Sequence, residues 1–311
     1  MIYTNFSKRD VQKLCQAIDS ITFCRGDIIA YACDAIICPD DTMLSGTGGL
    51  AKNVHQKAGP LLKKAIAGIG ACPVGQARVT DGFQLNAKYI IHTASPAWKD
   101  GMSCEELELA NCYAASIQKA FEMRCETVAV PSIGTGYHRF PKKRAAEIAI
   151  STLIYQLVRE QMPIKVTMVY TDEETYETYK NALKQVIVKL FLEYYSPESC
   201  ACNCLGDSDM EPYYFWMVKL RDLETVPHEY QDYIDANGFK ENFSEKYTTD
   251  QYYYLLSKNA HLWDYRTCLA YITYLQRKSY WSGGYVSYHA AQCKAGGVRN
   301  VLLRMHELLC E

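Results

Sequence analysis

Residues 126–150 read ETVAVPSIGTGYHRFPKKRAAEIAI, and this stretch decides the expected fold. Its first part, ETVAVPS, is a short apolar run typical of a buried strand. Glycines follow at once in residues 132–136, and Pro141 suits the first turn of a helix. A strand, a glycine loop and a helix in this order predict one unit of a layered α/β fold.

The same alternation of short apolar and longer amphipathic runs extends from about residue 20 to residue 195. We expect strands, buried on both faces, at ITFC, DAIIC, KYIIHTA, ETVAVPS and IKVTMVY. Helices are expected after the glycines at 46–49, at 103–124, from Pro141, and at about 173–195. Ser103 and Glu106 have the spacing of a capping box for the second of these helices.

The composition changes after residue 195. Residues 196–212, SPESCACNCLGDSDMEP, are polar and have no periodic apolar pattern, which indicates a linker. The stretches TTDQYYYLLSKN, YRTCLAYITYLQRKS and VRNVLLRMHELL beyond it have helical spacing. We therefore predict a domain at 1–195, a linker at 196–212 and a small α-helical domain at 213–311.

Charge and cysteine content narrow the functional classes. A net charge of -2 argues against nucleic-acid binding by bulk electrostatics. No run approaches the roughly 20 apolar residues that span a bilayer, and the N-terminus lacks a secretory signal, so we expect a cytoplasmic protein without membrane contact. The 14 cysteines are scattered, which favours reduced thiols.

Two features of the second half leave alternatives open. Cys200, Cys202 and Cys204 resemble soft-metal ligands, but no histidine or second cysteine pair nearby completes a zinc site, so no metal or cofactor is expected. More than half of the 25 tyrosines lie beyond residue 212, interleaved with Lys and Arg. They are either platforms for single-stranded nucleic acid or, as is commoner at helical spacing, core residues.

Three glycine-containing loops each follow a predicted strand: RGDI at 25–28, SGTGG at 45–49 and SIGTG at 132–136. In an open α/β sheet, ligands bind outside the carboxyl ends of the strands, where N–H groups at helix starts favour phosphate. Neither a dinucleotide GxGxxG nor a Walker-type loop is present in the right context. The loops predict a site for a phosphorylated ligand.

Together with DAII at 34–37, Val54-His55, Ala58-Gly59-Pro60 and SIGTGYHRFP at 132–141, these loops resemble the macrodomain family over roughly residues 20–185. The resemblance implies a three-layer α/β/α fold with a mostly parallel sheet. It also implies a site for ADP-ribose, free or attached to a protein or nucleic-acid partner, with no metal required.

The resemblance assigns roles at the adenine end of the ligand. Asp27 would accept a hydrogen bond from the exocyclic amine, the Ile28 N–H would serve a ring nitrogen, and Tyr170 would stack on the base. The alternatives are a turn-capping aspartate and a core tyrosine.

At the other end, the resemblance implies that backbone N–H groups form two walls around the diphosphate. The wall residues are Gly46, Thr47, Gly48, Gly49, Ser132, Gly134, Thr135 and Gly136. Tyr137, His138 and Phe140 would lie towards the distal ribose. His138 stands where the family frequently has tyrosine, so it either binds the ligand or is a loop histidine in solvent.

The pattern breaks where hydrolytic macrodomains carry Asn-Ala-Ala-Asn, because this chain has Cys38-Pro39-Asp40-Asp41. Asp41 replaces the asparagine that contacts the distal ribose. Ala51 stands where one hydrolase group has a water-positioning aspartate, and His55 where another has a nucleophilic lysine.

If the domain is catalytic, Asp41 is the best general base and Asp40 its rival. Because two carboxylates beside a diphosphate repel it, one of them is expected to turn away or to be hydrogen-bonded. Three hypotheses remain open. The chain is a recogniser of ADP-ribose, an ADP-ribosyl hydrolase with a non-standard acid, or a nucleotide sensor that signals through its second domain.

Overall fold

The computed structural model describes residues 8–194, 216, 218–220, 222–224, 257, 260–281 and 297–310. They belong to two compact units, Met1–Leu183 and Lys184–Glu311. The predicted linker at 196–212 and the cysteines at 200, 202 and 204 lie outside the described residues. The domain boundary at residue 195 stays a prediction.

A six-stranded sheet forms the centre of the first unit, in the order β1-β6-β5-β2-β4-β3. All neighbouring pairs are parallel except β3 with β4. The strands are β1 Ile21–Arg25, β2 Ala35–Asp40, β3 Ala77–Asp81, β4 Tyr89–Ala94, β5 Thr127–Val130 and β6 Lys165–Tyr170. Each of the five predicted strands is therefore confirmed, and β3 is an addition.

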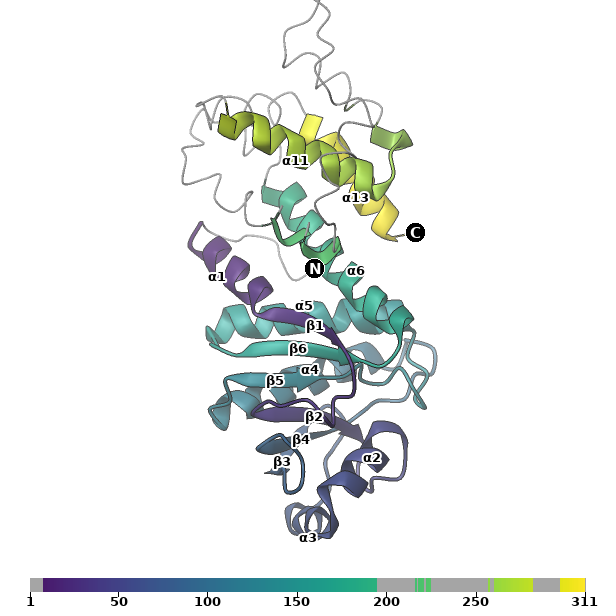
Figure 1. Ribbon diagram of the computed structural model, residues 1–311. Helices are drawn as coiled ribbons and strands as arrows, with labels where there is room; N and C mark the ends of the chain where they lie inside the picture. Colours follow the sequence, from purple (N-terminus) through teal and green to yellow (C-terminus); the bar gives the residue numbers. More distant parts are fainter. Residues whose placement is uncertain are drawn as a thin grey trace, which may run out of the picture. The chain divides into compact units, whose positions relative to one another are not determined.

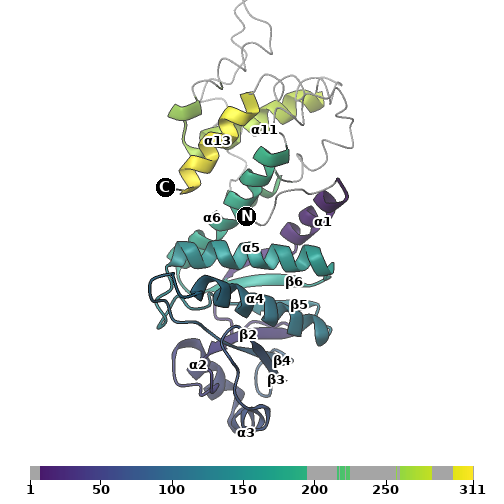
Figure 2. The ribbon, with the colours of Figure 1, turned by 180° about the vertical axis from the view of Figure 1, so that it is seen from behind.

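Helices cover the sheet, which confirms the predicted α/β fold with a mostly parallel sheet. Their bounds are α1 Lys8–Asp19, α2 Gly49–Ala58, α3 Pro60–Ile69, α4 Glu105–Glu122, α5 Lys142–Glu160 and α6 Glu173–Tyr194. Helices α4 and α5 lie together across one face, with α1 packed against α5 (Figure 2). Helices α2 and α3 pack against β2 and β3 respectively (Figure 1).

The expectation that all five strands are buried on both faces is wrong for β1. Thr22 and Arg25 of this strand are exposed. Among the described residues, strand β1 lies at the edge of the sheet and pairs with β6 alone, so no described strand lies along its other side. The central strand β2, by contrast, has buried residues along almost its whole length.

The capping box predicted at Ser103 and Glu106 is also wrong. Helix α4 begins at Glu105, and the residue before it, Cys104, has a left-handed backbone with φ 66° and no side-chain cap. The Glu105 carboxylate accepts the N–H groups of Ser103 at 2.7 Å and Lys99 at 3.2 Å. The loop before the helix thus folds back onto Glu105, and this displaces the expected cap.

The aspartate of the DAII motif joins the beginnings of neighbouring strands. Asp34 Oδ2 accepts the N–H groups of Glu126 at 2.9 Å and Thr127 at 3.0 Å, where β5 begins. Its backbone carbonyl accepts the N–H of Tyr89, the first residue of β4. The Lys88 ammonium, 2.5 Å from Oδ1, and these hydrogen bonds hold the pKa of Asp34 at about 2. This motif therefore aligns the strands that position the site.

The described part of the second unit is helical. It contains a short 3-10 helix, Ala260–Leu262, and the helices α11, Tyr265–Trp281, and α13, Gly297–Cys310, which pack on each other. The helices predicted from YRTCLAYITYLQRKS and VRNVLLRMHELL are therefore confirmed. The stretch at 248–259 lies outside the described residues except for Ser257.

Candidate functional site

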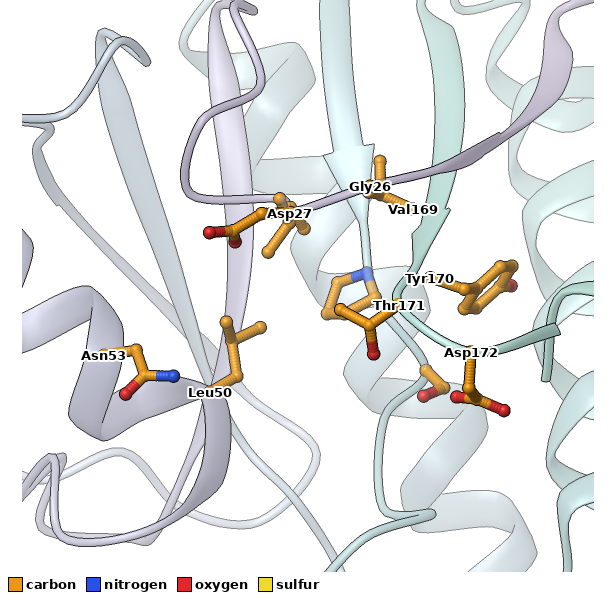
Figure 3. Close-up of a pocket in the computed structure, with 11 residues that line it drawn as sticks. Gly26, Asp27, Leu50, Asn53, Val169, Tyr170, Thr171 and Asp172 are labelled. Atoms are coloured by element: carbon orange, nitrogen blue, oxygen red, sulfur yellow. The ribbon is translucent and has the colours of Figure 1, made fainter. Parts of the chain in front are cut away.

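A cavity of about 330 Å³ opens at the carboxyl ends of the parallel strands (Figure 3). Segments far apart in the sequence supply its lining: the loop after β1, the first turns of α2, the end of β5 and the end of β6. The lining residues are Gly26, Asp27, Ile28, Leu50, Asn53, Pro131, Ser132, Val169, Tyr170, Thr171 and Asp172. This is the edge of the sheet at which α/β proteins bind ligands.

Asp27 caps its own turn and also faces the cavity. Its Oδ1 atom accepts the N–H of Ile29 at 3.0 Å, as the turn-capping alternative predicts. Among the described residues, no hydrogen bond reaches the Oδ2 atom of Asp27, and the side chain lies on the same side of the cavity as Asn53 (Figure 3). Oδ1 of Asp27 therefore stabilises the turn, while Oδ2 can accept a hydrogen bond from a ligand.

Two carboxylates line the cavity, and one of them has a cation beside it, because Lys142 Nζ lies 3.8 Å from Asp172 Oδ1. Asp27 and Asp172 both line it, and none of its 11 lining residues is Lys or Arg. The Thr175 N–H donates to Asp172 Oδ1 at 2.8 Å, and this bond lowers the pKa of Asp172, so its carboxylate is ionised at neutral pH. Such a lining disfavours a phosphate and suits an uncharged group that donates hydrogen bonds.

Tyr170 is a core residue as well as a lining residue. Its side chain is only 3% exposed, and its ring centroid lies 4.7 Å from that of Tyr179 on α6. In Figure 3 the ring points away from Asp27. This geometry favours the core-tyrosine alternative, and stacking of Tyr170 on a base stays a prediction.

The loop at 45–49 connects β2 to α2 and is shaped by glycine. Gly46 has φ 65°, and a Cβ atom there would overlap the imidazole of His55. Gly48 is the N-cap of α2, with extended backbone and open space around it, and Gly49 begins the helix. The start of α2 therefore presents exposed backbone N–H groups, an arrangement that attracts anions.

Asp41 holds this loop closed. Its Oδ1 atom accepts the N–H groups of Met43 at 2.8 Å and Ser45 at 3.2 Å, and its Oδ2 atom accepts the Ser45 hydroxyl. Burial by itself would raise the pKa of Asp41, but these hydrogen bonds outweigh it and lower the pKa. A carboxylate engaged through both oxygens is a weak proton acceptor, so the structure gives the general-base hypothesis no support, and it stays untested.

The loop at 132–136 follows β5, which pairs with β2, so the two glycine loops start from adjacent strands. Tyr113 of α4 anchors it, because its hydroxyl accepts the buried N–H of Ile133 at 3.0 Å. Within the loop the Thr135 hydroxyl donates to Ser132 Oγ at 2.9 Å, and the Phe140 N–H donates to the Gly134 carbonyl at 2.9 Å.

The three side chains expected near the distal ribose have different environments. Phe140 is 2% exposed and packs edge-on against Trp98, with the ring centroids 4.6 Å apart. Tyr137 is 93% exposed. His138 is half-buried, and its backbone carbonyl accepts a hydrogen bond from the backbone N–H of Trp98 at 2.9 Å. Tyr137 is thus accessible to a ligand, whereas Phe140 belongs to the support of the loop.

Four of the predicted residues, Asp27, Ile28, Ser132 and Tyr170, line one cavity. The other predicted residues lie along the neighbouring loops after β2 and β5. Sequence reasoning missed Leu50, Asn53, Thr171 and Asp172. The available signal was positional, because the last two directly follow a predicted strand and the first two lie in the first turns of a predicted helix.

Two further properties concern the described residues alone. In the described ranges, no group of three or more His, Cys, Asp or Glu side chains is arranged to hold a metal ion. Within that same part of the chain, every helix is too short or too polar to cross a bilayer.

Comparison with known proteins agrees with this geometry. The Macro domain family matches residues 39–149. A macro domain-containing protein of Methanosarcina mazei is 37% identical over 170 residues, which cover 55% of this chain and 91% of that protein. The chain therefore belongs to the macro domain family.

Solved structures show the same fold. The Oceanobacillus iheyensis macrodomain with ADP is 33% identical, with a TM-score of 0.51, over 54% of this chain and 91% of that one. The Trypanosoma brucei macrodomain in complex with ADP is 27% identical, with a TM-score of 0.50, over 54% of this chain and 70% of that one.

Proposed function

We propose that this protein is an ADP-ribose-binding module that recognises the free nucleotide or an ADP-ribosylated partner. The adenine enters the cavity beside Asp27, and the diphosphate lies between the loops at 45–49 and 132–136. The observation that carries this proposal is that the cavity at Asp27 has no Lys or Arg in its lining and lies beside the exposed residues Thr47, Gly48 and Gly49 at the start of α2. The ADP bound to the two solved macrodomains has the same adenine and diphosphate groups.

The direct test is calorimetry of the whole chain with ADP-ribose, comparing the wild type with Asp27→Ala. We expect Asp27→Ala to weaken binding by about 1 to 3 kcal/mol, because the adenine amine loses its acceptor. The matched control is Asp81→Ala, an exposed aspartate on β3 that is expected to leave affinity unchanged.

A second ligand sharpens this test. The hypoxanthine analogue of ADP-ribose has a carbonyl oxygen in place of the exocyclic amine, so it should bind the wild type more weakly than ADP-ribose does, and Asp27→Ala should lose less affinity for it than for ADP-ribose. Equal affinity of both proteins for ADP-ribose itself would remove Asp27 from the site. Absence of any binding by the wild type would refute the proposed function.

Recognition without hydrolysis gives a separate expectation. Because Ala51 supplies no carboxylate and Asp41 is engaged by its loop, we expect no release of ADP-ribose from modified proteins or nucleic acids. The assay compares the wild type with Asp41→Asn on several ADP-ribosylated substrates. Release by the wild type that falls about 10² to 10⁴-fold in Asp41→Asn would instead establish Asp41 as a general base.

A further inference from the structure

A buried carboxylate lies directly beneath the loop at 45–49. The side chain of Asp40, the last residue of β2, is 3% exposed. Its oxygens accept the N–H of Gly46 at 3.1 and 3.2 Å, and Oδ1 also accepts the N–H of Asp41 at 2.8 Å. Burying an ionised carboxylate is costly unless such bonds or a cation offset it. Asp40 therefore positions the loop but also places a negative charge under it.

The side chain of His55, on α2, lies beside this charge. Its Nε2 atom lies 3.2 Å from Asp40 Oδ2 but is not aligned for a hydrogen bond, and this buried nitrogen has no hydrogen-bond partner among the described residues. The His55 ring also packs under Gly46, where it leaves no room for a Cβ atom. A proton on Nε2 would thus have an ionised acceptor within reach.

The other titratable groups around this pair do not supply a compensating charge. Burial and the neighbouring His55 lower the pKa of His92, on β4, to about 4, so His92 is neutral near pH 7. Burial, and then the charge of Asp40, raises the pKa of the Cys38 thiol, which stays protonated. Asp41 adds a second carboxylate to the same loop. Among these groups, His55 is the one placed to offset the Asp40 charge, because its Nε2 atom lies 3.2 Å from Asp40 Oδ2.

We propose that Asp40 is a positioning residue for the diphosphate loop and that His55 controls its charge. With His55 neutral, the Asp40 carboxylate opposes an anionic ligand on the loop above it. With His55 protonated, the pair is neutral while the Gly46 hydrogen bond remains. Because a falling pH favours the protonated imidazole, affinity for a diphosphate should rise as the pH falls. The identity of the ligand rests on the proposed function.

The test is the pH profile of ADP-ribose affinity, measured by calorimetry from about pH 6 to 8.5, for wild type, Asp40→Asn and His55→Gln. Asparagine keeps an acceptor for the Gly46 N–H but removes the charge. We expect wild-type affinity to fall on the order of fivefold towards high pH, and Asp40→Asn to bind on the order of fivefold tighter than wild type at pH 8.5. The profiles of both variants should be flat.

The control for simple loss of a negative charge is Asp81→Asn, which should keep the wild-type profile. A flat wild-type profile, or an Asp40→Asn protein that binds more weakly than wild type at every pH, would overturn the proposal. If Asp40 had only a structural role, Asp40→Asn would not bind ADP-ribose more tightly than the wild type.

A measurement without nucleotide separates this inference from the proposed function. The NMR chemical shift of the Gly46 amide proton should change with pH in the wild type. Its acceptor is the Asp40 carboxylate, and protonation of His55 places a positive charge beside that carboxylate. The titration should vanish in His55→Gln and in Asp40→Asn. A Gly46 amide that does not titrate would refute the coupling, whatever the protein binds.

Discussion

Gly48→Glu should abolish ADP-ribose binding while leaving the fold intact. Gly48 has φ −133° and ψ 155°, a conformation open to any residue, and nothing lies within 4 Å of an added Cβ. A glutamate there would project from the start of α2 into the space proposed for the diphosphate. Because placing like charges together costs several kcal/mol, we expect at least about 100-fold weaker binding by calorimetry.

The backbone conformation shows why Gly48 is a better test position than Gly134, and it also identifies a matched control. Gly134 has φ 79°, and an added Cβ would lie 3.3 Å from Ser95 Oγ, so Gly134→Glu combines blockage with backbone strain. Gly68 on α3 is exposed and open like Gly48, which makes Gly68→Glu the matched control for an added charge. If Gly48→Glu stays folded by circular dichroism and binds like Gly68→Glu, the diphosphate does not lie at this loop.

Asp34→Ala should destabilise the first unit. It removes the acceptor of the Glu126 and Thr127 N–H groups, which join β2 to β5. Because these N–H groups are exposed or only partly buried, we expect their loss of an acceptor to cost about 1 to 2 kcal/mol in the free energy of unfolding, measured with urea. Lys88→Met, which removes only the exposed ammonium partner, should cost much less, because exposed ion pairs contribute little.

The same carboxylate predicts an acid limit to stability. The pKa of Asp34 is about 2 in the folded protein, below its ordinary value of 3.8. A depressed pKa means that the stabilisation is complete above about pH 4 and is lost as the pH falls towards 2. The difference in unfolding free energy between wild type and Asp34→Asn should therefore shrink below pH 4. A difference that stays constant down to pH 2 would contradict this assignment.

Local pattern predicted most of the first unit. The five strands were identifiable because parallel strands in a covered sheet are continuous apolar runs, and DAIIC and ETVAV have that composition. Helices α1 and α3 and the strand β3 were missed. The edge strand ARVTD has two buried, two half-buried and one exposed residue, and its sequence is neither a clear apolar run nor a clean alternation.

For the candidate site too, some features could be predicted from the sequence and others could not. Position after the predicted strands selected the three glycine-containing loops, because the carboxyl ends of parallel strands meet at one edge of the sheet, and the resemblance to the macrodomain family then selected Asp27 and Ser132 within them. The partners of Asp40 and Asp41 could not be predicted from their spacing. The Asp40 contact with His55 joins a strand end to a helix 15 positions later, and only the packing of α2 against β2 brings them together.

From the sequence alone follow the order of strands, loops and helices and the edge of the sheet where a ligand can bind, because these depend on local composition and on the shared direction of the strands. Tertiary structure decided which side chains line the cavity and which are buried. Tyr170 packs against Tyr179, and Phe140 against Trp98, through contacts between separate elements. Such packing depends on the shapes of residues that are distant in the chain, so the local sequence pattern does not predict it.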